Sequence, residues 1–125
     1  MIVRTLALAG MLGLAASLPA AAVDTSMQLV LTLDGPAQRD IATYQCEGID
    51  DPVTVQYINA HPIFLAVLPV EDDTLIFVAT VSGSGVRYVS GQYVWHTSGA
   101  EALLIDEMAG EDADPIDCIS AADIP

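Results

Sequence analysis

Short apolar runs, each ended by turn residues, constrain the fold of this chain more than any other feature. Turn signals recur every eight to twelve residues, and the runs between them are shorter than ordinary helices. In the clearest run, residues 53–57, Val53, Val55 and Tyr57 share one face of a strand by strict alternation. No helical period persists after the first 22 residues. The pattern therefore predicts an all-β antiparallel barrel or sandwich.

About eight strands are expected along the chain. They cover residues 41–46, 53–57, 63–68, 74–81, 86–89, 93–96, 101–105 and 116–119. Acidic loops are expected at residues 69–73 and between Asp106 and Asp117, where six acids fall. Residues 27–33 alternate only weakly, which indicates either an edge strand or a loosely held arm.

Between Ser82 and Leu104, five aromatic or basic side chains fall within ten residues: Arg87, Tyr88, Tyr93, Trp95 and His96. Ser-Gly sequences flank two short predicted strands here. They indicate turns, because glycine adopts turn conformations without steric cost. Tyr93 and Trp95 share one strand face, so they are either core residues or the surroundings of a recognition loop.

The first 22 residues have the features of an export signal. Arg4 precedes an apolar stretch at 6–16, and small residues then indicate cleavage between Ala22 and Val23. A membrane anchor is the alternative, but the apolar stretch is shorter than the roughly 20 residues that a span needs. No cysteine follows directly to accept a lipid. We expect a soluble periplasmic protein with a signal peptide at 1–22, an arm or edge strand at 23–40, and one domain at 41–125.

The charge of the mature chain limits the kinds of partner. Without the leader, two arginines, no lysine and seventeen acids remain, which gives a net charge of −15. Nucleic acid is excluded as a partner because binding phosphates needs Lys and Arg. A cationic partner is favoured, with association that depends on salt, although a generally acidic exported proteome is the alternative explanation.

Two cysteines, Cys46 and Cys118, are present in this exported chain. An even count in an oxidising compartment indicates one disulfide. Metal ligation and a reactive thiol are the alternatives, but there is no CxxC motif and no histidine near either cysteine.

The sequence motifs give little support for an enzymatic site or a metal site. The nucleophile-elbow pattern G-x-S-x-G is absent around Ser84, and only His61 and His96 are available as a general base. The acids at 111–117 lack the spacing of a calcium-binding EF-hand loop. We therefore expect neither an enzyme nor a metal or other cofactor.

Motifs across most of the mature chain resemble the C-type lysozyme inhibitors of Gram-negative bacteria, of the membrane-bound or periplasmic MliC/PliC type. The residues that carry the resemblance are Tyr44-x-Cys46, Val53-x-Val55-x-Tyr57, Leu65-Ala66-Val67-Leu68, Ser82-x-Ser84-Gly85-x-Arg87-Tyr88-x-x-Gly91-x-Tyr93-Val94-Trp95, Gly99-x-Glu101-Ala102 and Cys118. The resemblance implies an eight-stranded antiparallel barrel tied by the disulfide. It also implies inhibition of a C-type lysozyme by a loop inserted into the enzyme's cleft.

The resemblance also implies a binding site with one departure from the family pattern. The family's inhibitory serine corresponds to Ser84, but its lysine corresponds to Ser98. Ser98 can donate a hydrogen bond to a lysozyme carboxylate but cannot neutralise it. The expected lysozyme-binding residues are Ser84, Gly85, Arg87, Tyr88, His96, Ser98 and Gly99. The alternative function is a non-inhibitory exported binding module that kept the barrel and lost the lysine.

Overall fold

The computed structural model describes Gly10, residues 13–20, residues 26, 28, 30 and 32, and residues 34–123. The chain divides into two units, residues 1–30 and 31–125, and the strands lie in the second. The predicted cleavage site between Ala22 and Val23 and most of the stretch 27–33 lie outside the described residues. No helix within the described ranges is long and apolar enough to cross a membrane.

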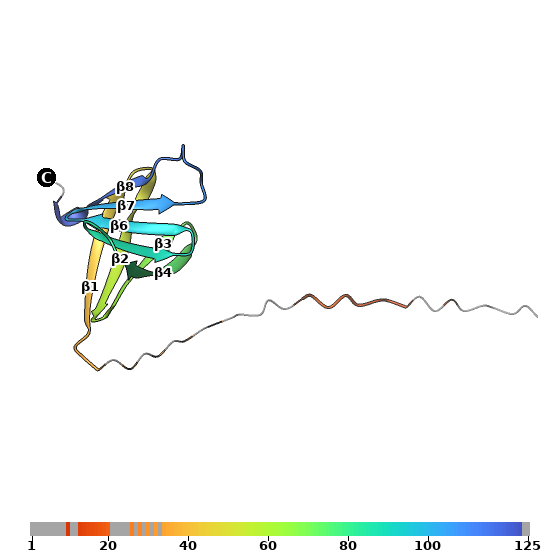
Figure 1. The fold of residues 1–125 in the computed structure, drawn as a ribbon. Helices are drawn as coiled ribbons and strands as arrows, with labels where there is room; N and C mark the ends of the chain where they lie inside the picture. Colours follow the sequence, from red (N-terminus) through yellow and green to blue (C-terminus); the bar gives the residue numbers. More distant parts are fainter. Residues whose placement is uncertain are drawn as a thin grey trace, which may run out of the picture. The chain divides into compact units, whose positions relative to one another are not determined.

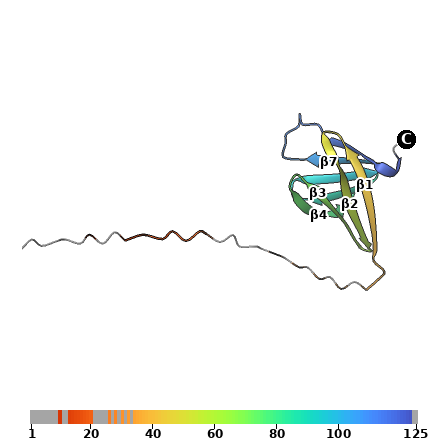
Figure 2. The ribbon, with the colours of Figure 1, turned by 180° about the vertical axis from the view of Figure 1, so that it is seen from behind.

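Eight antiparallel strands close into a barrel, which confirms the predicted fold class (Figures 1 and 2). Each strand pairs with its neighbours in sequence, and β1 pairs with β8 to complete the circle. The strands are β1 (Gln38–Cys46), β2 (Ile49–Ala60), β3 (Ile63–Val70), β4 (Asp73–Thr80), β5 (Val86–Ser90), β6 (Tyr93–Ser98), β7 (Glu101–Asp106) and β8 (Ile116–Ser120). A short 3₁₀ helix, Ala121–Asp123, follows β8.

The first hairpin is longer than the sequence predicted. A loop was expected from 47 to 52, but the turn holds only Glu47 and Gly48, and β2 begins at Ile49. Gly48 allows this tight turn because it adopts a φ of 76°. Pro52 lies where the register between β1 and β2 is irregular, a position where a strand tolerates a residue without an N–H donor.

The β3–β4 hairpin is also tighter than predicted. β3 continues to Val70, so the expected loop at 69–73 is reduced to a turn at Glu71 and Asp72. β4 ends at Thr80, one residue before the predicted end, and Val81 therefore leaves the sheet.

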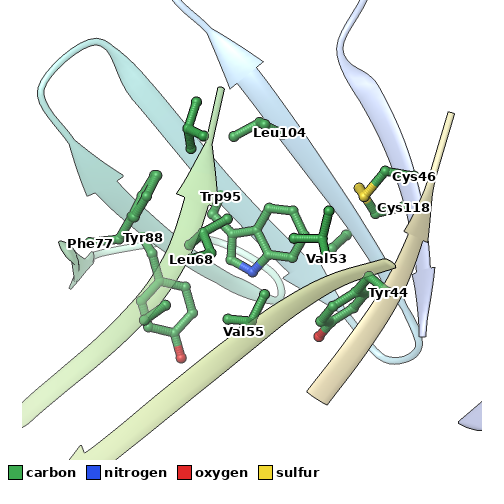
Figure 3. Close-up of a cluster of buried hydrophobic side chains, with 13 residues drawn as sticks. Tyr44, Cys46, Val53, Val55, Leu68, Phe77, Tyr88, Trp95, Leu104 and Cys118 are labelled. Atoms are coloured by element: carbon green, nitrogen blue, oxygen red, sulfur yellow. A yellow bond between two sulfur atoms is a disulfide. The ribbon is translucent and has the colours of Figure 1, made fainter. Parts of the chain in front are cut away.

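The barrel interior is filled by inward-facing side chains of all eight strands, drawn in Figure 3. Trp95 on β6 is fully buried, with 0% of its surface exposed, and Phe77, Leu68 and Val55 are also buried. Trp95 is therefore a core residue, which decides one of the alternatives left open by the sequence. Tyr93, two residues earlier, is partly buried against this core.

A chain of polar contacts runs through the aromatic core. The Trp95 Nε1–H donates to the Tyr57 hydroxyl oxygen at 2.9 Å, and the hydroxyls of Tyr57 and Tyr44 are 2.8 Å apart. The Tyr44 and Trp95 rings meet edge to face, with centroids 5.1 Å apart. Burial, and next the hydrogen bond to Tyr44, raises the pKa of Tyr57, which keeps its hydroxyl neutral.

The disulfide Cys46–Cys118 lies at the closure of the barrel. The two cysteines are directly paired across β1 and β8, and both are buried. The bond therefore ties the first strand to the last, as the sequence predicted.

Removing this bond should lower the stability of the barrel. We expect the double variant Cys46→Ala/Cys118→Ala to lose about 4 kcal/mol of unfolding free energy, because the bond closes a long loop of the unfolded chain. Urea unfolding of the oxidised protein and the variant measures the difference. The reduced wild-type protein is the control, and its stability should match that of the variant. A difference below about 1 kcal/mol between the oxidised protein and the variant would contradict this account.

Candidate functional site

The exposed connection between β4 and β5, Val81–Gly85, is called the Ser84 loop here. Ser84 and Gly85 are exposed, and Val81 is 99% exposed. An apolar side chain held almost wholly in water gains from contact with a partner. Val81 was not among the predicted site residues, because in the sequence it is the last residue of an apolar run that predicts a strand.

The Ser84 loop lies beside the end of β6. β5 pairs with β6, and this pairing brings Val86 opposite Thr97. The His96 Nε2 lies 2.9 Å from the Ser84 carbonyl oxygen. A carbonyl oxygen only accepts, so this ring nitrogen carries the hydrogen. The Ser82 hydroxyl donates to the same oxygen at 2.8 Å, so two side chains hold the backbone of Ser84 in place.

Gly85 makes this close approach possible. It adopts a φ of 65°, which favours glycine, and a Cβ placed there would collide with the carbonyl oxygen of Thr97. The same Cβ would come within 3.1 Å of the His96 Nε2. The resemblance had assigned Gly85 to the binding site, and the geometry gives it the role of spacer between two segments.

Ser98 and Gly99 continue from this contact into the turn between β6 and β7. Both are exposed, and Gly99 adopts a φ of 60°. Residues 96–99 and the Ser84 loop therefore form one rim at this end of the barrel, called the paired-loop rim below. Of the predicted site residues, Ser84, Gly85, His96, Ser98 and Gly99 meet there.

A groove of about 440 Å³ borders the rim beside His96 and Ser98. Three carboxylate side chains line it, those of Glu47, Glu101 and Asp117. They come from the β1–β2 turn and from strands β7 and β8, which are far apart in sequence. No local pattern in the sequence indicates this cluster, because only the barrel closure brings these segments together.

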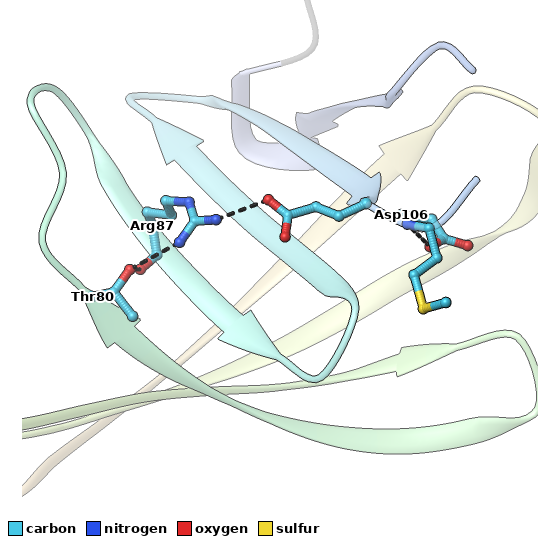
Figure 4. A network of polar contacts seen from close by, with 5 residues as sticks. Thr80, Arg87 and Asp106 are labelled. Carbon is cyan, nitrogen blue, oxygen red and sulfur yellow. Dashed lines mark hydrogen bonds and ion pairs between the residues drawn. The ribbon is translucent and has the colours of Figure 1, made fainter. Parts of the chain in front are cut away.

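Arg87 is engaged within the barrel wall rather than free at the rim. Its Nη2 donates to the Glu107 carboxylate at 3.0 Å, and its Nη1 lies 3.3 Å from the Thr80 hydroxyl (Figure 4). Both of these partners are side chains of the barrel and not groups of the Ser84 loop. Arg87 therefore already has an acidic partner on the barrel, with 36% of its side chain exposed.

Tyr88 does not belong to the surface of the site. Its side chain faces the barrel interior, 6% exposed, and its ring lies 5.7 Å from that of Tyr57. Burial raises the pKa of Tyr88, as expected for a phenol in the core. Including Tyr88 among the binding residues was therefore wrong, because alternation on β5 points it away from Arg87 and the solvent.

The rim lacks the contacts of a nucleophilic site. His96 is hydrogen-bonded to the backbone of Ser84, and no hydrogen bond joins its ring to the Ser84 hydroxyl. Among the described side chains, no group of three or more His, Cys, Asp or Glu residues is placed to hold a metal ion. The arrangement offers hydroxyls, backbone groups and an apolar tip, which suits recognition of another molecule.

Comparisons with known proteins agree on one family. A family model described as membrane-bound lysozyme-inhibitor of c-type lysozyme matches residues 44–113. A membrane-bound lysozyme inhibitor of C-type lysozyme from Pseudomonas aeruginosa is 44% identical over 92 residues, which cover 70% of this chain and 72% of the relative. A protein of the same name from Cupriavidus necator is 38% identical, covering 66% of this chain and 67% of the relative.

A solved structure supports the same relationship. The crystal structure of Pseudomonas aeruginosa MliC in complex with hen egg white lysozyme aligns with a TM-score of 0.65 and 34% sequence identity. The alignment covers 79% of this chain and 99% of that chain. Lipoprotein LprI of Mycobacterium bovis is a more distant relative, 33% identical over 62% of this chain and 40% of its own length.

The close approach of the two segments can be tested with alanine at two neighbouring glycines. Gly85→Ala should lose about 2 kcal/mol or more of unfolding free energy, through the left-handed backbone and the collision with Thr97. Gly83→Ala is the matched control, since a Cβ there meets nothing within 4 Å. Chemical denaturation measures both, and equal stabilities of the two variants would contradict the spacer role of Gly85.

Proposed function

Because this chain belongs to the family of membrane-bound lysozyme inhibitors of c-type lysozyme, we propose that it inhibits a C-type lysozyme. In this proposal the paired-loop rim enters the cleft of the enzyme. The names of its relatives place the chain among inhibitors rather than enzymes.

The observation that carries the proposal is the fixed contact between the Ser84 loop and the end of β6. His96 and Ser82 hold the Ser84 carbonyl, and Gly85 lets the loop lie against Thr97. A rim ordered before binding loses less conformational entropy when a partner closes on it. Val81 adds an exposed apolar contact at the same end of the barrel.

The chemistry of the rim also fits the cleft of a lysozyme. Lysozyme uses two carboxyl groups on either side of the scissile bond. The hydroxyls of Ser84 and Ser98 can donate hydrogen bonds to such carboxylates. Charge-assisted bonds from a lysine would be roughly twice as strong as neutral ones, so Ser98 makes this inhibitor weaker than a lysine-bearing one.

Electrostatics supply part of the attraction that the lysine would give. The mature chain carries a charge of −15, and the groove beside the rim adds the carboxylates of Glu47, Glu101 and Asp117. A cationic lysozyme would be drawn to this surface, and its basic side chains would find acceptors in the groove.

The proposed location is the periplasm, where an inhibitor meets lysozyme that has crossed the outer membrane. The leader at 1–22 supports export, with cleavage near Ala22. No cysteine directly follows the apolar stretch of the leader, and Cys46 and Cys118 further along are joined to each other, so we propose a form without a membrane anchor. The barrel domain, whose first strand begins at Gln38, and the residues from 23 to 37 before it would make up this mature form.

Serine at position 98, where the family pattern has a lysine, is the one observation that supports a second candidate function. A protein that kept the barrel but lost the inhibitory lysine would bind a partner without blocking the enzyme. Capture of lysozyme on the immobilised protein, without loss of muramidase activity, would identify this binding module.

The first test is lysozyme activity in the presence of excess protein at about 20 and 150 mM salt. We expect inhibition at low salt and weaker inhibition at the higher salt, because exposed charges are screened within about 8 Å at 150 mM. Val81→Asp should abolish much of the inhibition. Met108→Asp is the control, since it adds the same charge at a 77% exposed residue on the connection at the other end of the barrel.

The outcome that contradicts the proposal is full lysozyme activity at both salt concentrations. Equal loss of inhibition in the Val81 and Met108 variants would show that the Ser84 loop has no special part in the interaction, because an added negative charge by itself should not weaken the attraction of a cationic lysozyme.

A second test restores the charge at position 98. Ser98→Lys should strengthen inhibition at least about tenfold, because a desolvated charge pair at an interface is worth ~2 kcal/mol or more. Ser98→Met is the matched control, with a long side chain and no charge. Inhibition constants measure both; if lysine gives no gain over methionine, position 98 does not face the lysozyme carboxylates.

A further inference from the structure

A larger cavity, of about 650 Å³, lies at the opposite end of the barrel from the paired-loop rim. Antiparallel strands alternate in direction, so the β3–β4 turn and the β7–β8 connection meet at this end. Buried core residues Val53, Val70 and Leu104 line the cavity. The cavity therefore reaches from the surface down to the apolar interior.

The walls of this cavity are also mainly apolar. Ile49, Tyr93, Pro115 and Ile116 contribute to them, and Ala113 lines the cavity from the β7–β8 connection. Its volume falls within the range of about 300–1,000 Å³ typical of small-molecule sites, and barrel mouths are frequent places for them. The size fits one small molecule better than a protein surface.

Acidic side chains give the cavity a charge. Asp51, Glu71 and Asp114 line it and are exposed, which places them toward the mouth. In the described part of the chain, none of these three carboxylates has a hydrogen-bond or ion-pair partner, and no Arg or His lines the cavity. Desolvation, and then the negative charges of Glu71, Asp106 and Asp73, raise the pKa of Tyr93 in the cavity wall.

We propose that this cavity binds a small cationic amphiphile. The apolar part of the ligand would replace water against Val53, Val70 and Leu104, and its ammonium group would remain at the mouth beside Glu71 and Asp114. Burial of the apolar part supplies most of the affinity. The carboxylates select the sign of the charge, because an anionic head group would be repelled by the same side chains.

The test compares three probes with the same eight-carbon tail: octyltrimethylammonium, octyl glucoside and octanesulfonate. Titration is followed by backbone amide shifts of the isotope-labelled protein, below the micelle concentration of each probe. We expect the cation to bind about tenfold more tightly than the neutral probe, with shifts at Tyr93 and Leu104. The anion should bind more weakly than both.

Two sets of variants separate the apolar and the charged contributions. Ala113→Trp fills the cavity and should abolish binding of the cation. Glu71→Gln/Asp114→Asn should weaken it about tenfold, through two exposed charge contacts. Glu111→Gln/Asp112→Asn is the matched control, because it removes two charges from the connection without touching the cavity lining and should leave binding unchanged.

Each result decides for or against the proposal. Equal affinity for the three probes, tighter binding of the anion, or shifts outside the cavity would overturn it, as would no binding at all. Shifts of the cavity residues that depend on protein concentration alone would assign the cavity to a second copy of the chain instead. Melting temperatures check that each variant is folded, and lysozyme inhibition through the paired-loop rim should be unaffected by any of them.

Discussion

The burial of Trp95 at the centre of the barrel is the constraint on which the rest of the structure depends. Its indole N–H cannot lie in an apolar interior without an acceptor, because an unpaired buried donor costs about 1–3 kcal/mol. Tyr57 on β2 supplies that acceptor, and Tyr44 on β1 bonds to Tyr57 in turn. One tryptophan on β6 therefore constrains which side chains of β1 and β2 face the barrel interior.

The fold could be predicted from the sequence because its signals are local. Alternation at Val53, Val55 and Tyr57 indicates one buried face, and the turn residues mark where each strand ends. The strand ends were less predictable. Gly48 shortens a turn through its φ of 76°, and an acidic run such as Asp50-Asp51 remains in a strand because its side chains stay exposed. A run of acidic residues therefore indicates that the side chains are exposed, but it does not by itself indicate a loop.

The candidate site was only partly predictable, because its contacts join residues that are far apart in sequence. The motif identified the Ser84 loop, but nothing local indicates that Glu107 would engage Arg87 across twenty residues. The acidic groove has the same origin, since Glu47 and Asp117 become neighbours only when β1 meets β8. Tyr88 was misassigned for a different reason: a recognition motif mixes surface residues with the core residues that position them.

The contacts that hold the rim together do not involve the side chain at position 98. The Ser84 carbonyl is held by His96 and Ser82, and Gly85 lies against the carbonyl of Thr97, so none of these contacts uses the side chain of Ser98. A serine in place of the lysine of the family pattern can therefore alter the strength of binding without altering the shape of the rim. The same reasoning applies to the other end of the barrel, where the cavity is lined by core residues that the fold requires and by exposed acids that it does not. In such a small barrel the shape of each end is set by the core, and the chemistry of each end is free to change one exposed side chain at a time.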